Sequence, residues 1–154
     1  MTVCFFIPGL FGAPYVPTLT KHAETALDLL DLQLGQTMLE LGCGDGKVVL
    51  AAARRGWNVV GYELNPVLAA IVWVRTIRYR KHVHVVCGNF FKKPLPPADG
   101  IYCFIMPRFM PAVHKKILDS PHLHKSSLKL ASFSFKIPGK TPDKIQDNVF
   151  IYTY

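Results

Sequence analysis

Short apolar runs alternate with amphipathic stretches along most of the chain. Six runs rich in β-branched and aromatic residues predict strands, at residues 37–41, 57–62, 82–87, 99–106, 128–137 and 149–154. Apolar residues at helical spacing predict helices between them, at residues 20–32, 46–55, 66–80 and 110–119. Strands that alternate with helices form a parallel sheet joined by right-handed crossovers. The pattern therefore predicts an α/β protein with a doubly wound, mostly parallel sheet of about six strands flanked by helices.

Capping and turn residues mark the boundaries of these elements. Thr20 is the predicted N-cap of the first helix. The apolar face of that helix is formed by Ala23, Ala26, Leu27, Leu30 and Leu34. Gly56 is expected to end the second helix as its C′ glycine, and Pro66 suits the first turn of the third. Residues 88–98 contain three prolines, so this stretch is predicted to be a loop.

The length of 154 residues fits one domain with a single core. We divide the chain into an apolar N-terminal arm at residues 1–18 and a single domain at residues 19–154. The arm is too short and too interrupted by proline and glycine to span a bilayer, which takes about 20 apolar residues. It also lacks the basic start and the cleavage site of a secretory signal peptide. Two interpretations stay open: a remnant of a membrane anchor, and an arm that lies on the core.

The net charge of +8 is unevenly distributed. Residues 1–63 hold four Lys/Arg and six Asp/Glu, for a net charge of −2, whereas residues 64–154 hold 14 Lys/Arg and four Asp/Glu, for a net charge of +10. Such a division points to an anionic neighbour for the second part, either nucleic acid or an acidic membrane surface. A solvated basic face without any partner is the alternative.

Cysteine and histidine show no pattern that suits a metal site. The four cysteines, Cys4, Cys43, Cys87 and Cys103, lack C-x-x-C spacing and stand mostly in apolar surroundings. They are expected to be buried free thiols in a reducing compartment, which indicates a cytoplasmic protein. The six histidines have no acid or cysteine close by in sequence to complete a ligand set. We therefore predict no metal.

Residues 37–46 predict a ligand-binding turn, because a buried strand runs there into three glycines at alternate positions. Gly42, Gly44 and Gly46 allow the backbone to turn sharply and to lie flat against a ligand. Glu40 and Asp45 place two carboxylates in the same turn, which suits a cationic ligand without phosphate. S-adenosylmethionine (SAM) is such a ligand, since it has a sulfonium and an amino group.

Two other nucleotide sites with glycine-rich turns do not fit this stretch. The dinucleotide fingerprint G-x-G-x-x-G requires glycine where Lys47 stands. A P-loop requires Ser or Thr where Val48 stands. The glycine pattern therefore favours the SAM loop of a methyltransferase.

The ends of the other predicted strands supply further candidates, because ligands of doubly wound sheets bind at the carboxyl ends of the strands. Glu63 follows the second strand and is placed to accept both ribose hydroxyls of a nucleoside. Asn89 and Phe90 follow the third, where an amide can bond an adenine amino group and a ring can stack beside it. Residues 104–107 end the fourth strand under the expected position of the methyl group.

Several runs of sequence together resemble a known family. They are Pro14-Tyr-Val-Pro-Thr18, Leu39-Glu-Leu-Gly-Cys-Gly-Asp-Gly-Lys47, Ala51-Ala-Ala-Arg-Arg-Gly56, Gly61-Tyr-Glu-Leu-Asn-Pro66 and Met106-Pro107. Over about residues 15–154 the chain resembles the seven-strand, Rossmann-like SAM-dependent methyltransferases. More narrowly, it is similar to the small lysine methyltransferases that modify the c subunit of ATP synthase and the adenine nucleotide translocase, and to their prokaryotic relatives. The eukaryotic members have an N-terminal hydrophobic anchor, whereas this sequence has only the short apolar arm, and residue 89 is often aspartate in the wider superfamily.

The resemblance, together with the strand-end argument, defines the expected site. It implies that Tyr15 and Thr18 fold over the methionine end of SAM. The full set of expected cofactor-binding residues is Tyr15, Thr18, Glu40, Gly42, Cys43, Gly44, Asp45, Gly46, Glu63, Leu64, Asn65, Asn89 and Phe90. The candidates for an apolar channel that admits the methyl acceptor are Tyr15, Phe104, Ile105, Met106 and Pro107. No general base is assigned.

These expectations lead to N-methylation of a protein lysine by in-line methyl transfer. An apolar channel would disfavour the ammonium form of the acceptor lysine and so prepare a neutral amine. The expected partner is a protein, with peripheral membrane contact through the apolar arm and the basic face as a further expectation. RNA or small-molecule methylation and a non-catalytic interaction module are the alternatives. Nucleic acid is less favoured, because the Asp/Asn-Pro-Pro-aromatic motif of base methylases is missing at residues 105–107.

Overall fold

A computed structural model describes residues 20–154, apart from the side chains of residues 124 to 126. The predicted arm at residues 1–18, including Tyr15 and Thr18, lies outside the described residues.

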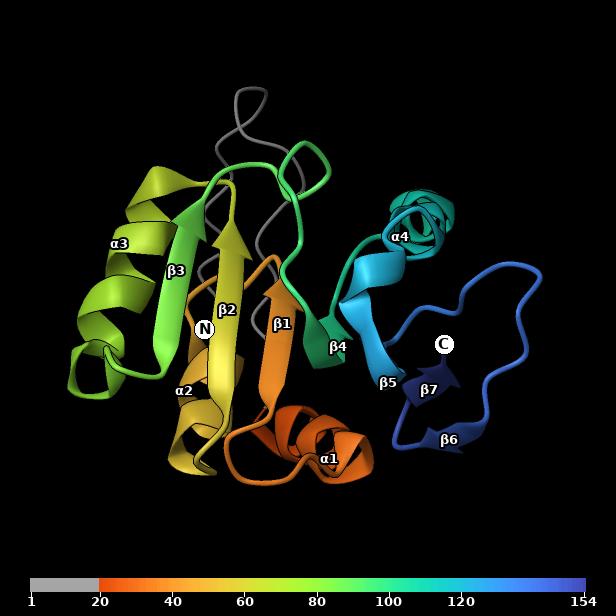
Figure 1. The fold of residues 1–154 in the computed structure, drawn as a ribbon, viewed down its shortest axis with the longest axis horizontal. Coiled ribbons are helices and arrows are strands. Elements are labelled where there is room, and N and C mark those ends of the chain that lie inside the picture. The colour runs from red at the N-terminus through yellow and green to blue at the C-terminus, as the bar shows by residue number, and fades with distance from the viewer. Residues whose placement is uncertain (1–19) are drawn as a thin grey trace, which may run out of the picture.

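The described chain forms a seven-stranded sheet in the order β3-β2-β1-β4-β5-β7-β6 (Figure 1). Its strands are β1 (Thr37–Leu41), β2 (Asn58–Glu63), β3 (Val83–Cys87), β4 (Ala98–Cys103), β5 (His124–Phe133), β6 (Lys144–Gln146) and β7 (Val149–Thr153). The first five strands are parallel, whereas β7 runs antiparallel to both β5 and β6. The order reverses between β1 and β4, as in a doubly wound sheet. The predicted fold class is confirmed, with β6 as the one strand that the sequence pattern did not indicate.

Among residues 20–154, four α-helices and three short 3-10 helices precede or connect the strands. The α-helices are α1 (Thr20–Leu30), α2 (Lys47–Arg54), α3 (Pro66–Arg75) and α4 (Met110–Leu118). The 3-10 helices are η1 (Ile77–Tyr79), η2 (Pro107–Phe109) and η3 (Pro121–Leu123). Among the described residues, no helix is long and apolar enough to cross a membrane.

Several predicted boundaries are wrong by a few residues, and left-handed backbone explains two of them. Asp31 has φ 49° and ends α1 early, so Leu34 is 82% exposed rather than on the buried face. Thr20 is the first residue of α1 and not its N-cap. Ser134 has φ 66° and ends β5 at Phe133, although the pattern continued to residue 137.

The fourth strand also ends earlier than predicted, at Cys103. Its neighbour β1 pairs with it only as far as Leu41, because the chain leaves the sheet at Gly42. Residues 104–106 therefore form a connection between β4 and η2 instead of the end of a strand.

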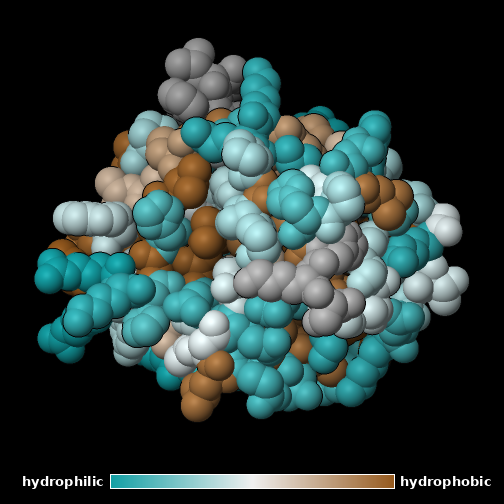
Figure 2. All heavy atoms as spheres, in the orientation of Figure 1, coloured by the Kyte–Doolittle hydropathy of each residue, from teal (hydrophilic) through white to brown (hydrophobic). Residues whose placement is uncertain are grey.

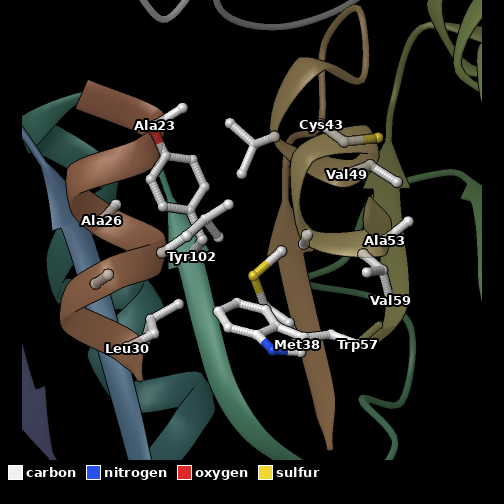
Figure 3. Close-up of a cluster of buried hydrophobic side chains, with 14 of the residues drawn as sticks. Ala23, Ala26, Leu30, Met38, Cys43, Val49, Ala53, Trp57, Val59 and Tyr102 are labelled. Carbon is white, nitrogen blue, oxygen red and sulfur yellow. The ribbon is translucent and has the colours of Figure 1, made fainter. Parts of the chain in front are cut away.

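Two apolar clusters cover the two faces of the sheet, because side chains alternate along each strand. Met38 of β1 and Tyr102 of β4 point to the face covered by α1, α2 and α3, where they lie between α1 and α2 (Figure 3). Leu39 and Ile101, their neighbours in sequence, point to the face covered by α4 and by Leu95 of the loop before β4. These two clusters hold β1, β2 and β4 in place, and most of the described candidate site residues lie at the carboxyl ends of these strands.

Candidate functional site

The glycine turn after β1 is fastened to β2 by backbone hydrogen bonds. The N–H groups of Gly42 and Cys43 both donate to the carbonyl of Tyr62, each at 2.9 Å. The Gly46 N–H donates to the carbonyl of Cys43 at 2.8 Å and closes the turn before α2. Backbone hydrogen bonds thus fasten the turn to β2 and close it before α2.

Glycine is required in this turn for two different reasons. Gly42, Gly44 and Gly46 have φ of 83°, 52° and 78°, a region that residues with a Cβ rarely adopt. A Cβ on Gly46 would lie 2.8 Å from Cγ1 of Val72, a fully buried side chain of α3. A Cβ on Gly42 would meet no atom of the described residues within 4 Å. Gly46 therefore allows α3 to pack closely, whereas the space beside Gly42 is clear of the described residues.

Glu63 connects the turn to the start of α3. Its side chain is buried, one carboxylate oxygen accepts the Gly44 N–H at 2.8 Å, and the other accepts the Asn65 N–H at 2.8 Å. A carboxylate has about four acceptor positions, so both oxygens keep capacity for a further donor. The residue that the sequence predicted to hold ribose hydroxyls is thus already oriented by the backbone.

Glu40 is a buried acid beside the same turn. It is 3% exposed, and its Oε2 has no hydrogen-bond partner among the described residues. Burial, and then the nearby carboxylates of Asp45 and Glu63, raise the pKa of Glu40 well above its usual range, although a hydrogen bond with the Val49 backbone acts the other way. An unsatisfied buried carboxylate is costly, and a cationic donor placed beside it would remove that cost.

Asp45 and Cys43 behave differently from Glu40. The Asp45 carboxylate forms ion pairs with Arg75 at 3.0 Å and with Lys47 at 3.4 Å, so two cations offset its charge. Arg75 also donates to the Asp45 carbonyl at 2.6 Å, which fastens the turn to α3. Burial raises the pKa of the Cys43 thiol, so this cysteine is a neutral packing residue.

The remaining described cofactor candidates follow β2 and β3, and the polar groups of two of them are partly in use. Asn65 caps α3, because its Oδ1 accepts the Val67 N–H at 2.9 Å, and the preceding Leu64 is 40% exposed. Asn89 accepts the Phe91 N–H at 2.9 Å, and the Phe90 ring lies 4.1 Å from the Phe91 ring. Cofactor contact by these residues stays a prediction.

The acceptor candidates after β4 divide between the two faces of the sheet. Phe104 packs against the cluster under α1, Ile105 against the cluster under α4, and both are half-buried. Met106 is half-buried and Pro107 is the exposed first residue of η2. The structure therefore leaves Phe104 as the candidate that joins a larger aromatic group.

That group, which we call the aromatic wall, consists of His22, Phe104, Phe133 and Phe135. The ring centroid of Phe133 lies 4.6 Å from that of His22 and 4.9 Å from that of Phe104. Phe135 stacks on Phe104 at 6.0 Å. Sequence reasoning missed His22, Phe133 and Phe135, because they come from α1 and from the end of β5 and meet only in the folded chain. The one signal in the sequence was that Phe133 and Phe135 are two residues apart in the predicted strand at residues 128–137, which would place them on the same face of that strand.

The prediction of buried free thiols holds for Cys43 and Cys103 but is wrong for Cys87, which is exposed at the end of the half-exposed strand β3. The described residues contain no group of three His, Cys, Asp or Glu side chains that could hold a metal ion. Burial raises the pKa of the Cys103 thiol to about 12, so this cysteine stays neutral. The His122 ring donates a hydrogen bond to the Leu95 carbonyl at 2.7 Å, which fastens η3 to the loop before β4.

A model of a known protein family matches the part of the chain that contains most of these residues. The ANTKMT methyltransferase domain matches residues 40–144, which include the glycine turn, Glu63 and most of the aromatic wall. The chain belongs to this family. The predicted resemblance to SAM-dependent methyltransferases is thereby confirmed.

Individual relatives match this chain over a longer stretch than the family model does. The ATP synthase C-subunit lysine N-methyltransferase of Xenopus laevis is 31% identical over 137 residues, which cover 86% of this chain and 58% of the frog protein. The human protein of the same name is 30% identical over 148 residues, which cover 90% of this chain and 60% of that protein. The chain thus spans less than two thirds of the length of either relative. A protein-lysine N-methyltransferase of Saccharolobus islandicus is 27% identical over 156 residues and is matched over 92% of both chains.

A solved structure shows the same fold over nearly the whole chain. An RNA methyltransferase from Salinibacter ruber, in complex with S-adenosyl-L-homocysteine, superposes with a TM-score of 0.77 at 21% identity. The superposition covers 90% of this chain and 92% of that one. A likeness at this identity supports the fold of the family and no finer statement.

Proposed function

We propose that this protein binds S-adenosylmethionine at the glycine turn and methylates the side-chain amine of a protein lysine. The observation that supports the lysine acceptor most directly is the match along 92% of both chains to the archaeal protein-lysine N-methyltransferase. The names of the frog and human relatives specify the same kind of acceptor.

The residues present fit the cofactor. The described residues leave space beside Gly42 for a ligand against the backbone, and they offer no hydrogen-bond partner to Oε2 of Glu40, which suits a cationic group. Glu63 has acceptor capacity left for ribose hydroxyls. When bound, SAM supplies the methyl group, and the protein residues hold it and orient the acceptor.

The aromatic wall suits a lysine side chain. Its rings lie beside the end of β4 and form a largely apolar surface that favours the neutral amine over the ammonium ion. The faces of the same rings can also attract an alkylated ammonium product through cation–π interactions. The channel role of Ile105, Met106 and Pro107, and of Tyr15 outside the described residues, remains part of this proposal.

The partner and the location complete the proposal. The acceptor is a protein, and the C subunit of ATP synthase, for which the frog and human relatives are named, is the first protein to test. A cytoplasmic protein with peripheral membrane contact remains our expectation, since the buried Cys43 and Cys103 are free thiols.

Titration calorimetry with SAM tests the cofactor site. Wild-type protein should bind, and Glu63→Gln should bind at least about tenfold more weakly, because a hydrogen bond to a charged group contributes about 1.5–3 kcal/mol. Glu24→Gln is the matched control, since Glu24 pairs with Arg55 on the surface of α1. Equal affinities of the two variants would contradict the assignment of Glu63.

Methyl labelling of fractionated lysates with radioactive SAM tests the acceptor. We expect label in protein that is recovered as methyllysine after hydrolysis. RNA methylation is the second candidate, because residues 64–98 contain six Lys/Arg and no Asp or Glu. Label confined to RNA would replace the lysine proposal with this one, and label in neither fraction from protein that binds SAM would exclude both.

A further inference from the structure

The outer surface of α3 is apolar, although it faces away from the sheet. The helix packs on β2 and β3 through Ala69 and Val72, its only two buried residues. The residues that we call the α3 surface are exposed by 41–66%: Val67 (66%), Ile71 (41%), Trp73 (59%), Val74 (62%) and Ile77 (46%). Figure 2 shows brown apolar surface on this side of the molecule, at the left of the view, next to teal polar side chains.

Helical spacing makes this a continuous stripe. Val67, Ile71 and Val74 are separated by four and three residues, so they lie above one another on one side of the helix. With Ala70 they line a surface depression that Arg75 borders. The neighbouring α2 buries four of its eight residues, so it follows the ordinary amphipathic pattern that α3 departs from. An apolar outer stripe of this kind marks a surface that binds something other than water.

The charged residues in and directly after α3 are all basic. No Asp or Glu occurs between residues 64 and 98. Arg78, Arg80 and Lys81 follow the helix directly, they are exposed, and they form no ion pair with any of the described residues. Arg75 is the exception, because it pairs with Asp45. The surface therefore combines aliphatic side chains, an exposed tryptophan and three available cations.

We propose that the α3 surface docks on an anionic lipid bilayer. Aliphatic side chains and tryptophan partition into the interfacial zone of a bilayer, while arginine and lysine contact lipid phosphates. Each cation close to such a membrane strengthens binding by about fivefold, because it contributes about 1 kcal/mol. The proposal concerns lipid binding and does not depend on the proposed methylation.

Other binding partners would complement only the apolar part or only the basic part of the α3 surface. Residues 1–19 are apolar but contain no acid, so they would leave the three cations without partners. A second copy related by two-fold symmetry would place like charges against one another. RNA would contact the cations but gains little from valine and isoleucine side chains.

Vesicle sedimentation with the full chain tests the proposal. Wild-type protein should bind phosphatidylcholine vesicles that contain phosphatidylglycerol, and binding should weaken at high salt and without the anionic lipid. Trp73 is exposed whereas Trp57 is 3% exposed, so membrane contact should shift tryptophan emission to shorter wavelength, and Trp73→Phe should remove that shift.

Matched variants locate the contact. Val67→Ser/Ile71→Ser/Val74→Ser should weaken binding at least tenfold, and Arg78→Ser/Lys81→Ser should do the same. Leu118→Ser/Ile145→Ser is the control, because these apolar side chains are 58% and 55% exposed elsewhere, and it should bind as the wild type does. Circular dichroism and SAM affinity verify that each variant is folded.

Three results would overturn the proposal. The first is a lack of binding to anionic vesicles, and the second is unchanged binding by the folded triple variant. The third is a wild-type dimer in sedimentation velocity that the triple variant abolishes, which would assign the α3 surface to a second copy. Because lipid binding is measured without a methyl acceptor, each of these results leaves the proposed methylation untouched.

Discussion

The carboxyl edge of the sheet is built in two different ways. On the proposed cofactor side, residues 40–46 and 63–65 form one turn and one strand end that are held together by backbone hydrogen bonds and by the Gly44 N–H, which donates to the Glu63 carboxylate at 2.8 Å. On the proposed acceptor side, the aromatic wall brings together His22 of α1, Phe104 after β4, Phe133 at the end of β5 and Phe135 two residues beyond it. The first side depends on backbone conformation, and the second on packing between distant segments.

This difference matches two requirements of a methyltransferase, which must bind a common cofactor and a particular acceptor. A cofactor that is common to many methyltransferases can be held by a backbone conformation that glycine adopts far more readily than other residues. An acceptor differs from one methyltransferase to another, and side chains on separate elements can be exchanged without disturbing the turn. The two sides should therefore respond differently to substitution.

The largest expected effect is that of Gly46→Ala on the cofactor side. A left-handed residue with a Cβ costs about 1–2 kcal/mol, and the contact at 2.8 Å with Val72 adds about 1–3 kcal/mol. Chemical denaturation should show the loss of stability, and SAM affinity should fall by more than about a hundredfold because the turn must move.

Gly139→Ala is the control for that variant. Gly139 has φ 76°, and a Cβ there would meet no described atom within 4 Å, so this change should cost about 1 kcal/mol and leave SAM affinity unchanged. If both variants lost equal stability and bound SAM equally, the close packing of Gly46 on α3 would have no role in the site.

The next effect should appear on the acceptor side. Phe133→Leu is expected to cost about 1 kcal/mol of stability and to raise KM for the protein acceptor about tenfold, with SAM affinity unchanged. Steady-state kinetics with the acceptor identified by labelling, together with calorimetry for SAM, would separate the two constants.

Phe150→Leu provides a matched core change on the other face. Phe150 and Phe133 are 6% and 9% exposed and belong to neighbouring strands, but Phe150 is not part of the aromatic wall. It should lose similar stability and keep the wild-type KM. The same rise in KM for both variants would mean that general loosening of the sheet, rather than the wall, affects the acceptor.

The smallest effect on stability is expected for Glu40→Gln, which tests the buried acid beside the glycine turn. The pKa of Glu40 is higher in the folded chain than in the unfolded chain. The favourable contribution of Glu40 to stability is therefore complete at a pH below its unfolded pKa. This contribution is lost as the pH rises through its folded pKa. The variant should therefore be more stable than wild type at neutral pH, with the difference vanishing in acid. SAM binding should weaken about tenfold, since a bound cation favours the ionised form of Glu40 and glutamine cannot supply that charge.

Denaturation across pH and calorimetry at neutral pH measure both consequences for Glu40. A stability difference that did not change with pH would show that Glu40 titrates normally. Unchanged SAM affinity would remove Glu40 from the cofactor site.

Much of the cofactor side could be predicted because it is local in sequence. The spacing of Gly42, Gly44 and Gly46 after an apolar run, and Glu63 at the next strand end, define a turn and an acid that adjacent parallel strands must bring together. The pairing of Asp45 with Arg75 could not be predicted in the same way, because it depends on how α3 lies against the turn.

Sequence patterns did not predict the aromatic wall, the end of β5 or the presence of β6. Nothing in the sequence around Ser134 indicates φ 66°, yet that residue ends β5 and sets the place of Phe135. β6 is three exposed residues whose pairing with β7 stabilises them, so no apolar pattern indicates it.

The sequence by itself determined the alternation of strands and helices, the glycine turn and the family, because each of these depends on short-range periodicity or on residues with unusual backbone freedom. Only the tertiary structure decided that His22 meets Phe133, that Glu40 Oε2 is buried without a partner among the described residues, and that α3 turns an apolar stripe away from the core. These three facts depend on which surfaces the packed elements cover, and the burial of a side chain is a property of the whole fold.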